Sequence, residues 1–309
     1  MTITVDEAAS GGPVKQAPTA FREISLNRRI RNNAARVVFA ACFVIGVIPL
    51  VWLLITVVGN GASALTDPNW WFGNAYGVDT TTDFGAGVSQ AIIGSVVQAL
   101  VATVISVPIA VMTAIMLVEY PTSKLVKPVS FMVDILAGVP SIVATLFIFT
   151  VFVIGLSMGQ SGFMVSLALI LLMIPIVVRS TEEMLKLVPD ELREASYALG
   201  IPKWKTILRV VIPTALSGML SGIFLAIARV MGETAPVLIL AGPASTQVQT
   251  NPFQGGQNSL PLFIKDMWAA SQPASAFYYW GAALTLIVII AVLNIIAALL
   301  AKFLAPKTR

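Results

Sequence analysis

The chain has 309 residues, of which 57% are hydrophobic and only 11% are charged, and its formal net charge is +4. Soluble domains are about a quarter charged and just under half apolar, so this composition excludes a large soluble core and indicates a membrane protein with several spans. The chain has no histidine and one cysteine, Cys42, which excludes an internal disulfide and argues against a His/Cys metal site. It has no basic stripe interleaved with aromatic residues, so nucleic-acid binding is not expected.

Six apolar runs are long enough to cross a bilayer, which takes roughly 20 residues for a hydrocarbon core about 30 Å thick. They lie at about 37–58, 88–118, 129–155, 162–178, 214–241 and 282–304. The second and fifth runs exceed a straight crossing, so we expect them to tilt, to kink at Pro108 and Pro236, or to extend past the membrane surface. No cleavage-site pattern follows the first run, which predicts a retained helix.

The distribution of Lys and Arg predicts the orientation of these spans. Seventeen of the 19 cations lie in residues 1–36, 119–128 and 179–213 and in the tail from 302 onward. The alternate loops, 59–87, 156–161 and 242–281, contain only Lys265. Because cytoplasmic loops are enriched in Lys and Arg, both termini are predicted to be cytoplasmic.

The two longer external loops carry aromatic residues. Trp70, Trp71 and Phe72 lie in the first, and the second turns aromatic at "AFYYW". Aromatic residues near span ends typically anchor a protein in the membrane interface. An outward docking surface for a partner is the alternative interpretation.

The loop 179–213 is amphipathic and carries charges of both signs. Pro189 followed by acidic residues predicts a helix start, Gly200 a helix end, and Pro202 the start of another helix. Trp204, Ile207 and Leu208 follow at i, i+3 and i+4, which gives one apolar stripe. We therefore expect a short helix lying across the membrane surface, with a face for lipid or for a partner's groove.

Within this loop, "EASYALGIPKWKTILRVVIP" resembles the signature of membrane subunits of bacterial binding-protein-dependent ABC importers. That signature is Glu-Ala-Ala, three residues, Gly, nine residues and an Ile-x-Leu-Pro-like ending. It falls here on Glu194, Ala195, Ser196, Gly200, Val210, Ile212 and Pro213, with mild departures at Ser196, Val210 and Ile212. The resemblance implies a coupling helix inserted into a cytoplasmic ATPase subunit. The coupling residues would be Glu194, Ala195, Gly200, Trp204, Lys205 and Ile207. An amphipathic linker lying on lipid is the alternative.

The chain has no phosphate-binding loop of the form G-x-x-x-x-G-K-[ST]. It therefore cannot bind ATP in that manner, and the ATPase must be another polypeptide. No cofactor is expected on this chain, and ATP and magnesium would bind to the partner ATPase subunit.

Two charges stand inside the fifth apolar run, in "IARVMGETAPVLIL" at 227–240. An unpaired Arg or acidic residue at the centre of a membrane helix costs roughly 2.5–3.5 kcal/mol on insertion scales. Arg229 and Glu233 are four residues apart, so on a helix they share one face and can pair. Intramembrane charges usually face a wet cavity or a substrate path, and Arg binds oxyanions through two charge-assisted hydrogen bonds. We predict that Arg229 binds an anion and that Glu233 neutralises it beforehand; a purely structural ion pair is the alternative.

The stretch "ARVMGETAPVLIL" is also similar to the fifth-helix signature of phosphate-importer permeases, Ala-Arg-x-x-Gly-Glu-Thr-Ala-Pro-Leu, with Val237 in place of the leucine. It resembles the PstA branch more than its sister PstC, as do "DILAGVPSIV" at 134–143 and "RSTEEMLKLVP" at 179–189. The likeness covers about 85–309. It implies a heterodimer with a PstC-like permease, two PstB-like ATPase subunits and an external PstS-like phosphate-binding protein.

The predicted substrate pathway comprises Arg229, Glu233, Thr234 and Arg179. Arg179 closes the fourth run toward the cytoplasm, where it is either a plain positive-inside anchor or a contact for the departing anion. Asp134, near the cytoplasmic start of the third run, is interpreted as a snorkelling or capped carboxylate.

The sequence thus predicts an all-α membrane protein with six spans and the type I ABC importer permease fold, located in the bacterial cytoplasmic membrane. Its predicted segments are a basic cytoplasmic leader (1–36), a first span with external loop (37–84), the permease domain (85–304) and a cytoplasmic tail (305–309). It would move phosphate inward by alternating access. The alternatives are another oxyanion (sulfate, molybdate or phosphonate), an ion-coupled secondary transporter, and a membrane-embedded regulatory or assembly protein.

Overall fold

The computed structural model describes residues 26–76, 85–270 and 272–304, and its regular elements there are all helices. The predicted all-α class is confirmed. The chain divides into two units, Met1–Ile55 and Thr56–Arg309. The leader before Leu26, the tail 305–309 and part of the first external loop (77–84) fall outside the described residues.

Helix α1, Leu26–Leu65, contains the first predicted span but begins eleven residues before it. Four arginines of the predicted leader therefore lie on the helix, at positions 28, 29, 31 and 36. Nearly every side chain from Leu26 to Ile55 is exposed, including those of large apolar residues such as Phe39, Phe43 and Trp52. An apolar surface of this length is typical of contact with lipid or with another membrane helix.

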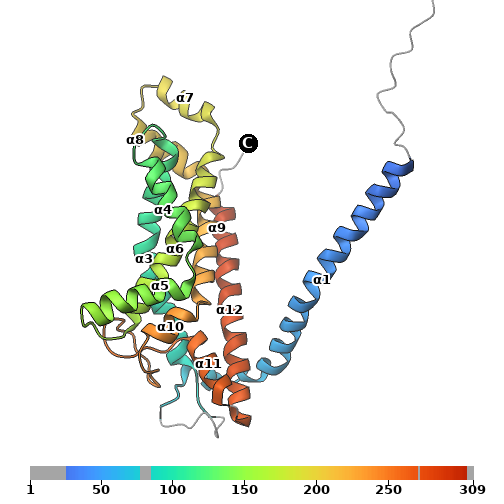
Figure 1. Ribbon diagram of the computed structural model, residues 1–309, viewed down its shortest axis with the longest axis vertical. Coiled ribbons are helices and arrows are strands. Elements are labelled where there is room, and N and C mark those ends of the chain that lie inside the picture. Colours follow the sequence, from blue (N-terminus) through green and yellow to red (C-terminus); the bar gives the residue numbers. More distant parts are fainter. Residues whose placement is uncertain (1–25, 77–84, 271, 305–309) are drawn as a thin grey trace, which may run out of the picture. The chain divides into compact units, whose positions relative to one another are not determined.

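Four long helices form the core of the second unit: α3 (Ser89–Glu119), α6 (Gly162–Lys186), α9 (Ile212–Met231) and α12 (Pro273–Leu304). Figure 1 shows them side by side, and α3 packs most extensively against α6. Small side chains on α3, at Ala102, Ala110 and Ala114, are fully buried in this core. Small residues let membrane helices approach closely, and this accounts for the extensive packing of α3 against α6.

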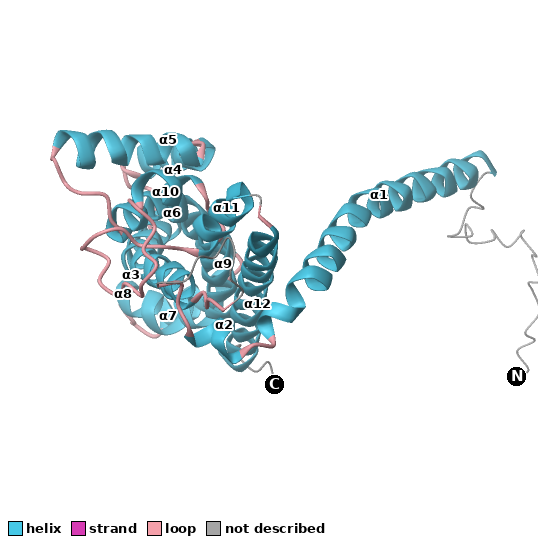
Figure 2. Ribbon diagram, turned by 90° about the horizontal axis from the view of Figure 1, so that it is seen from below, coloured by secondary structure: helices cyan, strands magenta, loops and turns pink. Residues whose placement is uncertain are grey.

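The third predicted span, 129–155, is not one continuous helix. Helix α4 (Val126–Gly138) is followed by α5 (Ser141–Ile148) and a π-helical turn, η1 (Phe149–Gly155), with a bend of 104° between the two parts. The bend lies at Val139, whose extended backbone is the conformation favoured before a proline. Figures 1 and 2 show α5 lying crosswise to the core helices and projecting from their side.

The fifth predicted span, 214–241, is displaced and interrupted. Helices α8 (Lys203–Thr206), η2 (Ile207–Val211) and α9 follow one another without a break, so the apolar helix runs from Lys203 to Met231. Helix α10 (Ala235–Leu240) resumes after three residues. Counted over the described residues, five helices are long and apolar enough to cross a membrane, or six if the bent pair forms one span.

The predicted external loops contain helices α2 (Pro68–Phe72) and α11 (Leu260–Ala270). Trp70 and Tyr278 are fully buried and stacked 6.1 Å apart between ring centroids, and Trp70 Nε1 donates to Thr285 Oγ1 at 2.9 Å. These two aromatic residues therefore belong to a packed core and are not interfacial anchors. Phe72, in contrast, is exposed.

The loops predicted to be cytoplasmic gather at one end of the second unit. Helix α7 (Asp190–Ala198) and α8 lie at the upper end in Figure 1, whereas α10 and α11 lie toward the lower end. The helix break beside Arg229 and the predicted coupling loop are therefore at opposite ends of the same helical unit.

Candidate functional site

The interruption after α9 has a local cause in the sequence. Gly232 caps α9, and its N–H donates to the backbone oxygen of Arg229 at 3.1 Å. Pro236 lies in the first turn of α10, where a proline has no N–H to offer a preceding turn. The apolar helix therefore ends at Met231, and the residues Gly232–Thr234 form a polar break between two helices.

Arg229 lies in the last turn of α9, just before this break, and its side chain is exposed. It is 26 residues beyond Lys203, about 39 Å along the helix axis, so it lies near the end of the helix and not at its middle. The predicted i, i+4 pair with Glu233 is wrong for this structure, because the helix ends between them. Among the described residues, Arg229 has no ion-pair partner within 4.0 Å. A guanidinium in this position is available to a ligand or to another chain.

Glu233 is half-buried and borders a small cavity of about 10 Å³. Its polar lining also includes Ser95, Gln98 and Ser259, which come from α3 and from the segment just before α11. A cavity of this size holds about one water molecule, and these polar side chains suit it. Thr234, the next residue, is exposed. The structure thus separates the predicted pathway residues: Arg229 and Thr234 face outward from the chain, and Glu233 faces a polar cavity.

Two buried glutamine side chains are hydrogen-bonded to each other beside this cavity. Gln98 Nε2 donates to Gln257 Oε1 at 3.1 Å, and Gln257 Nε2 donates to the backbone oxygen of Gln249 at 2.8 Å. A Cβ at Gly94 would overlap the backbone oxygen of Asn258, and a Cβ at Gly162 would force the Gln257 side chain to move. This contact was not predicted from the sequence. The one feature of the sequence that could have indicated it is a glycine near the start of each of two apolar runs, Gly94 and Gly162.

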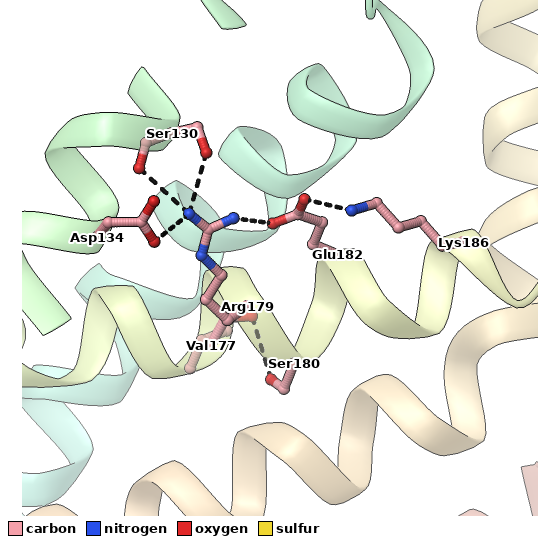
Figure 3. A network of polar contacts seen from close by, with 7 residues as sticks. All are labelled: Ser130, Asp134, Val177, Arg179, Ser180, Glu182 and Lys186. Carbon is pink, nitrogen blue, oxygen red and sulfur yellow. Dashed lines mark hydrogen bonds and ion pairs between the residues drawn. The ribbon is translucent and has the colours of Figure 1, made fainter. Parts of the chain in front are cut away.

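Arg179 is held in a polar network between α6 and α4, shown in Figure 3. It is ion-paired with Asp134 and, at 2.5 Å, with Glu182, and it donates to Ser130 Oγ at 3.0 Å. Lys186 Nζ in turn lies 2.7 Å from Glu182 Oε1. Asp134 is thus an ion-pair partner, whereas the prediction was a snorkelling or capped carboxylate. Arg179 ties two helices together, and a pathway role would require it to leave these partners.

The predicted boundaries of the first loop helix agree with the structure. Helix α7 begins at Asp190, directly after Pro189, and ends before Gly200, which has φ = +74°. Gly200 N–H donates to the oxygen of Tyr197 at 2.9 Å, and Ile201 N–H donates to the oxygen of Ser196 at 3.2 Å. These two bonds form a Schellman motif, which requires a left-handed residue and therefore favours glycine.

The second predicted loop helix does not lie separately on the membrane surface, because α8 continues into η2 and α9. Trp204 and Leu208 are exposed, as predicted for a docking face, but Ile207 is only 5% exposed and packs inside. Glu194, Ala195 and Gly200 are exposed, and Lys205 is half-buried. Ile207 is therefore a core residue, and the exposed part of the predicted coupling set consists of Glu194, Ala195, Gly200 and Trp204.

These environments predict opposite outcomes for two alanine substitutions. Ile207→Ala removes a buried aliphatic side chain and is expected to lower the free energy of unfolding by roughly 2–4 kcal/mol. Trp204→Ala removes an exposed side chain and should leave stability unchanged while weakening attachment of any protein docked there. Thermal unfolding in detergent and co-purification of bound proteins measure the two effects. Equal unfolding midpoints for the two variants would contradict this assignment.

No cluster of three or more His, Cys, Asp or Glu side chains that could hold a metal ion occurs in the described part of the chain. Most of the ion pairs in that part of the chain lie at the end that carries α7, and the pair Lys265–Asp266 lies on α11.

Comparison with known protein families gives a match over residues 106–309 to the family described as binding-protein-dependent transport system inner membrane component. Among curated proteins, the chain is 51% identical to phosphate transport system permease protein PstA 1 of Mycobacterium tuberculosis H37Rv, over all of this chain and 99% of the relative. It is 52% identical to PstA of Mycobacterium leprae over 96% of this chain and 95% of the relative. PstA of Yersinia pestis is 38% identical over 87% of this chain and 90% of the relative.

Among solved structures, the chain is similar to a chain of the MetNI methionine ABC transporter in an inward-facing conformation. The TM-score is 0.56 at 19% sequence identity, and the match covers 71% of this chain and 95% of the other. At this identity the similarity concerns the fold, which is that of an ABC importer permease.

Proposed function

The chain belongs to the family of binding-protein-dependent transport system inner membrane components, and from this membership we propose that it is the permease subunit of an ATP-driven importer of inorganic phosphate. It is a multi-pass protein of the bacterial inner membrane. As a permease it provides the passage and performs no catalysis of its own. We propose that ATP and magnesium bind to a separate ATPase subunit.

The observation that carries the choice of phosphate is full-length similarity to PstA proteins, together with Arg229 at the helix break. The residues that match the phosphate-importer signature, 228–236, span the end of α9, the polar break Gly232–Thr234 and the start of α10. An exposed guanidinium that lacks an ion pair among the described residues, at the end of an apolar helix, suits a bidentate oxyanion. We assign Arg229, with Glu233 and Thr234 beside it, to the substrate pathway.

The complex that we propose contains a PstC-like sister permease, two PstB-like ATPase subunits and a PstS-like phosphate-binding protein outside. The exposed surface of α7 and Trp204 would dock on one ATPase subunit. Closure of the two ATPase subunits on ATP would move the coupling helices and open the passage outward, and hydrolysis would return it to the inward-facing state.

Purification of the chain with its partners in mild detergent tests this function. The co-purifying proteins are identified by mass spectrometry, and ATP hydrolysis is measured with the external binding protein and phosphate, sulfate, molybdate or a phosphonate. We expect that, of these anions, only phosphate stimulates ATP hydrolysis in the presence of the binding protein. Stimulation by sulfate or molybdate and not by phosphate would change the cargo. Transport by this chain alone, driven by an ion gradient, would contradict the importer assignment.

A further inference from the structure

A buried ion pair joins the coupling helix to the end of a core span. Arg193 lies in α7, and Glu119 is the last residue of α3. Arg193 Nη2 and Nε lie 3.1 and 3.2 Å from Glu119 Oε1, and the two side chains are 13% and 4% exposed. Exposed ion pairs are common at surfaces, but a pair removed from water persists only with good geometry and further hydrogen bonds.

Arg193 has these further bonds, and they reach a second span. Its Nη1 donates to the backbone oxygen of Val188 at 2.6 Å, and its Nη2 donates to the backbone oxygen of Leu185, in α6, at 3.0 Å. Asp190, which is 87% exposed, is a third acceptor at 3.1 Å. The rigid fork of a guanidinium can hold several acceptors at once, and one side chain therefore connects α7 with the ends of α3 and α6.

The same end of α3 is also held by the helix that leads to Arg229. Lys203, the first residue of α8, donates to the backbone oxygen of Glu119 and lies 4.3 Å from the centre of the Tyr120 ring. A helix C-terminus and the face of an aromatic ring both stabilise a nearby positive charge, so both contacts favour Lys203 in this position. Glu119 is thus bonded through its carboxylate to the coupling helix and through its backbone to the start of the α8–α9 helix.

Little else attaches α7 to the membrane helices. Ser196 is its one buried residue, and its hydroxyl is paired with Thr206 at 2.8 Å. The remaining polar attachment of α7 among the described residues is Arg193. A displacement imposed on the exposed face of α7 can therefore pass through the flanking chain, through its packing on α8 and η2 with the Ser196–Thr206 bond, or through Arg193, which reaches α3 and α6.

Helix α3 extends from this contact to the polar cavity at the other end. Ser95 and Gln98, which border the cavity with Glu233, precede Glu119 on the same uninterrupted helix. The distance from Ser95 to Glu119 is 24 residues, about 36 Å along the axis. A shift of the Glu119 end can therefore reach the surroundings of the helix break along one continuous helix, which Pro108 does not interrupt.

We propose that the Arg193–Glu119 ion pair is the joint that transmits displacement of the coupling helix to α3 and, through α3, to the Glu233 cavity. This inference rests on the proposed importer function and deepens it. Arg193 and Glu119 are positioning residues, which act through α3 and do not touch the substrate.

The test compares two isosteric substitutions of carboxylates at the same end of the second unit. Glu119→Gln removes the buried charge that Arg193 contacts, and Glu183→Gln removes an exposed charge on α6, which lies outside α7 and has no ion pair among the described residues. Both variants are reconstituted as the full complex in proteoliposomes with the external binding protein and labelled inorganic phosphate. The readouts are the amount of assembled complex, ATP hydrolysis, and phosphate transported per ATP hydrolysed. For Glu119→Gln we expect normal hydrolysis but about tenfold less phosphate per ATP, in the usual range of coupling between sites. Glu183→Gln should match the wild type.

A double variant, Glu119→Met with Arg193→Met, guards against loss of folding. Replacing both members of a buried pair by apolar residues of similar volume is often neutral for stability. We expect this variant to assemble and to hydrolyse ATP with the same low transport ratio. If the pair is merely structural, its removal would reduce the amount of complex but leave the phosphate transported per ATP unchanged in the complex that survives. That result would overturn the proposal. If the wild-type complex itself transports no phosphate, the proposed function fails and not the joint.

Discussion

Replacing Arg229 by alanine is expected to abolish phosphate uptake while the complex still assembles. The side chain is exposed and has no ion-pair partner among the described residues, so its removal breaks no ion pair there. Its loss would remove two charge-assisted hydrogen bonds to the anion, each roughly 1.5–3 kcal/mol, and uptake should fall by about 100-fold or more. Uptake of labelled phosphate into cells, with membrane levels of the chain measured in parallel, tests this expectation.

Two further variants separate charge from geometry. Arg229→Lys keeps the positive charge but loses the planar fork, so uptake between that of the wild type and Arg229→Ala is expected. Arg36→Ala removes an exposed arginine from α1, far in sequence from the break, and should leave uptake unchanged. Wild-type uptake by Arg229→Ala would exclude Arg229 from the pathway. Loss of the chain from the membrane would show that its role is structural.

The apolar runs of the sequence predicted where helices occur but not where they bend. Run length and composition gave helices at all six predicted positions, because burial in lipid requires about 20 apolar residues with internally bonded backbone. The hydropathy of a run does not indicate the direction of the helix axis, so the 104° bend before α5 was not predicted. The proline at position 140 carried that information, since it favours an extended residue before it.

The same limit explains the site beside Arg229. Its chemistry was visible in the sequence as two charges in an apolar run, whereas their relative geometry depended on where the helix ended. Gly232 and Pro236 together end α9, and the i, i+4 relation between Arg229 and Glu233 no longer applies. The other polar residues of the Glu233 cavity come from separate segments, since Ser95 precedes Glu233 by more than 100 residues and Ser259 follows it beyond α10, so only the packed structure brings them to one cavity.

In the cytoplasmic loop, single residues predicted the helix ends correctly, whereas the apolar spacing predicted the wrong environment for Ile207. The ends of α7 were predictable because a proline and a glycine fix backbone conformation at single positions. Ile207 was assigned to the wrong face because the spacing rule assumes 3.6 residues per turn. A π-helical turn begins at this residue, and its wider i→i+5 bonding rotates the side chains relative to an α-helix.

Replacing Gly200 by proline is expected to uncouple transport from ATP hydrolysis. Gly200 has φ = +74°, whereas proline is fixed near −65°, and proline also lacks the N–H that bonds to Tyr197. The Schellman motif cannot form, so α7 should lose its defined end and its orientation toward the ATPase. Stimulation of ATP hydrolysis by the phosphate-loaded binding protein should fall about tenfold or more. Gly200→Ala keeps the N–H and strains the backbone by only roughly 1–2 kcal/mol, so a smaller loss is expected.

Gly255 provides the matched control on the opposite side of the membrane. It too has a left-handed backbone, with φ = +67°, and no atom lies near enough to obstruct a side chain at either glycine. Gly255→Pro imposes the same backbone conflict outside the coupling loop, so assembly and stimulation by phosphate should be largely retained. If both proline variants lose stimulation equally, general misfolding explains the result. If Gly200→Pro retains full stimulation, the loop behaves as an amphipathic linker on lipid, because only a helix docked on an ATPase needs a fixed orientation at this residue.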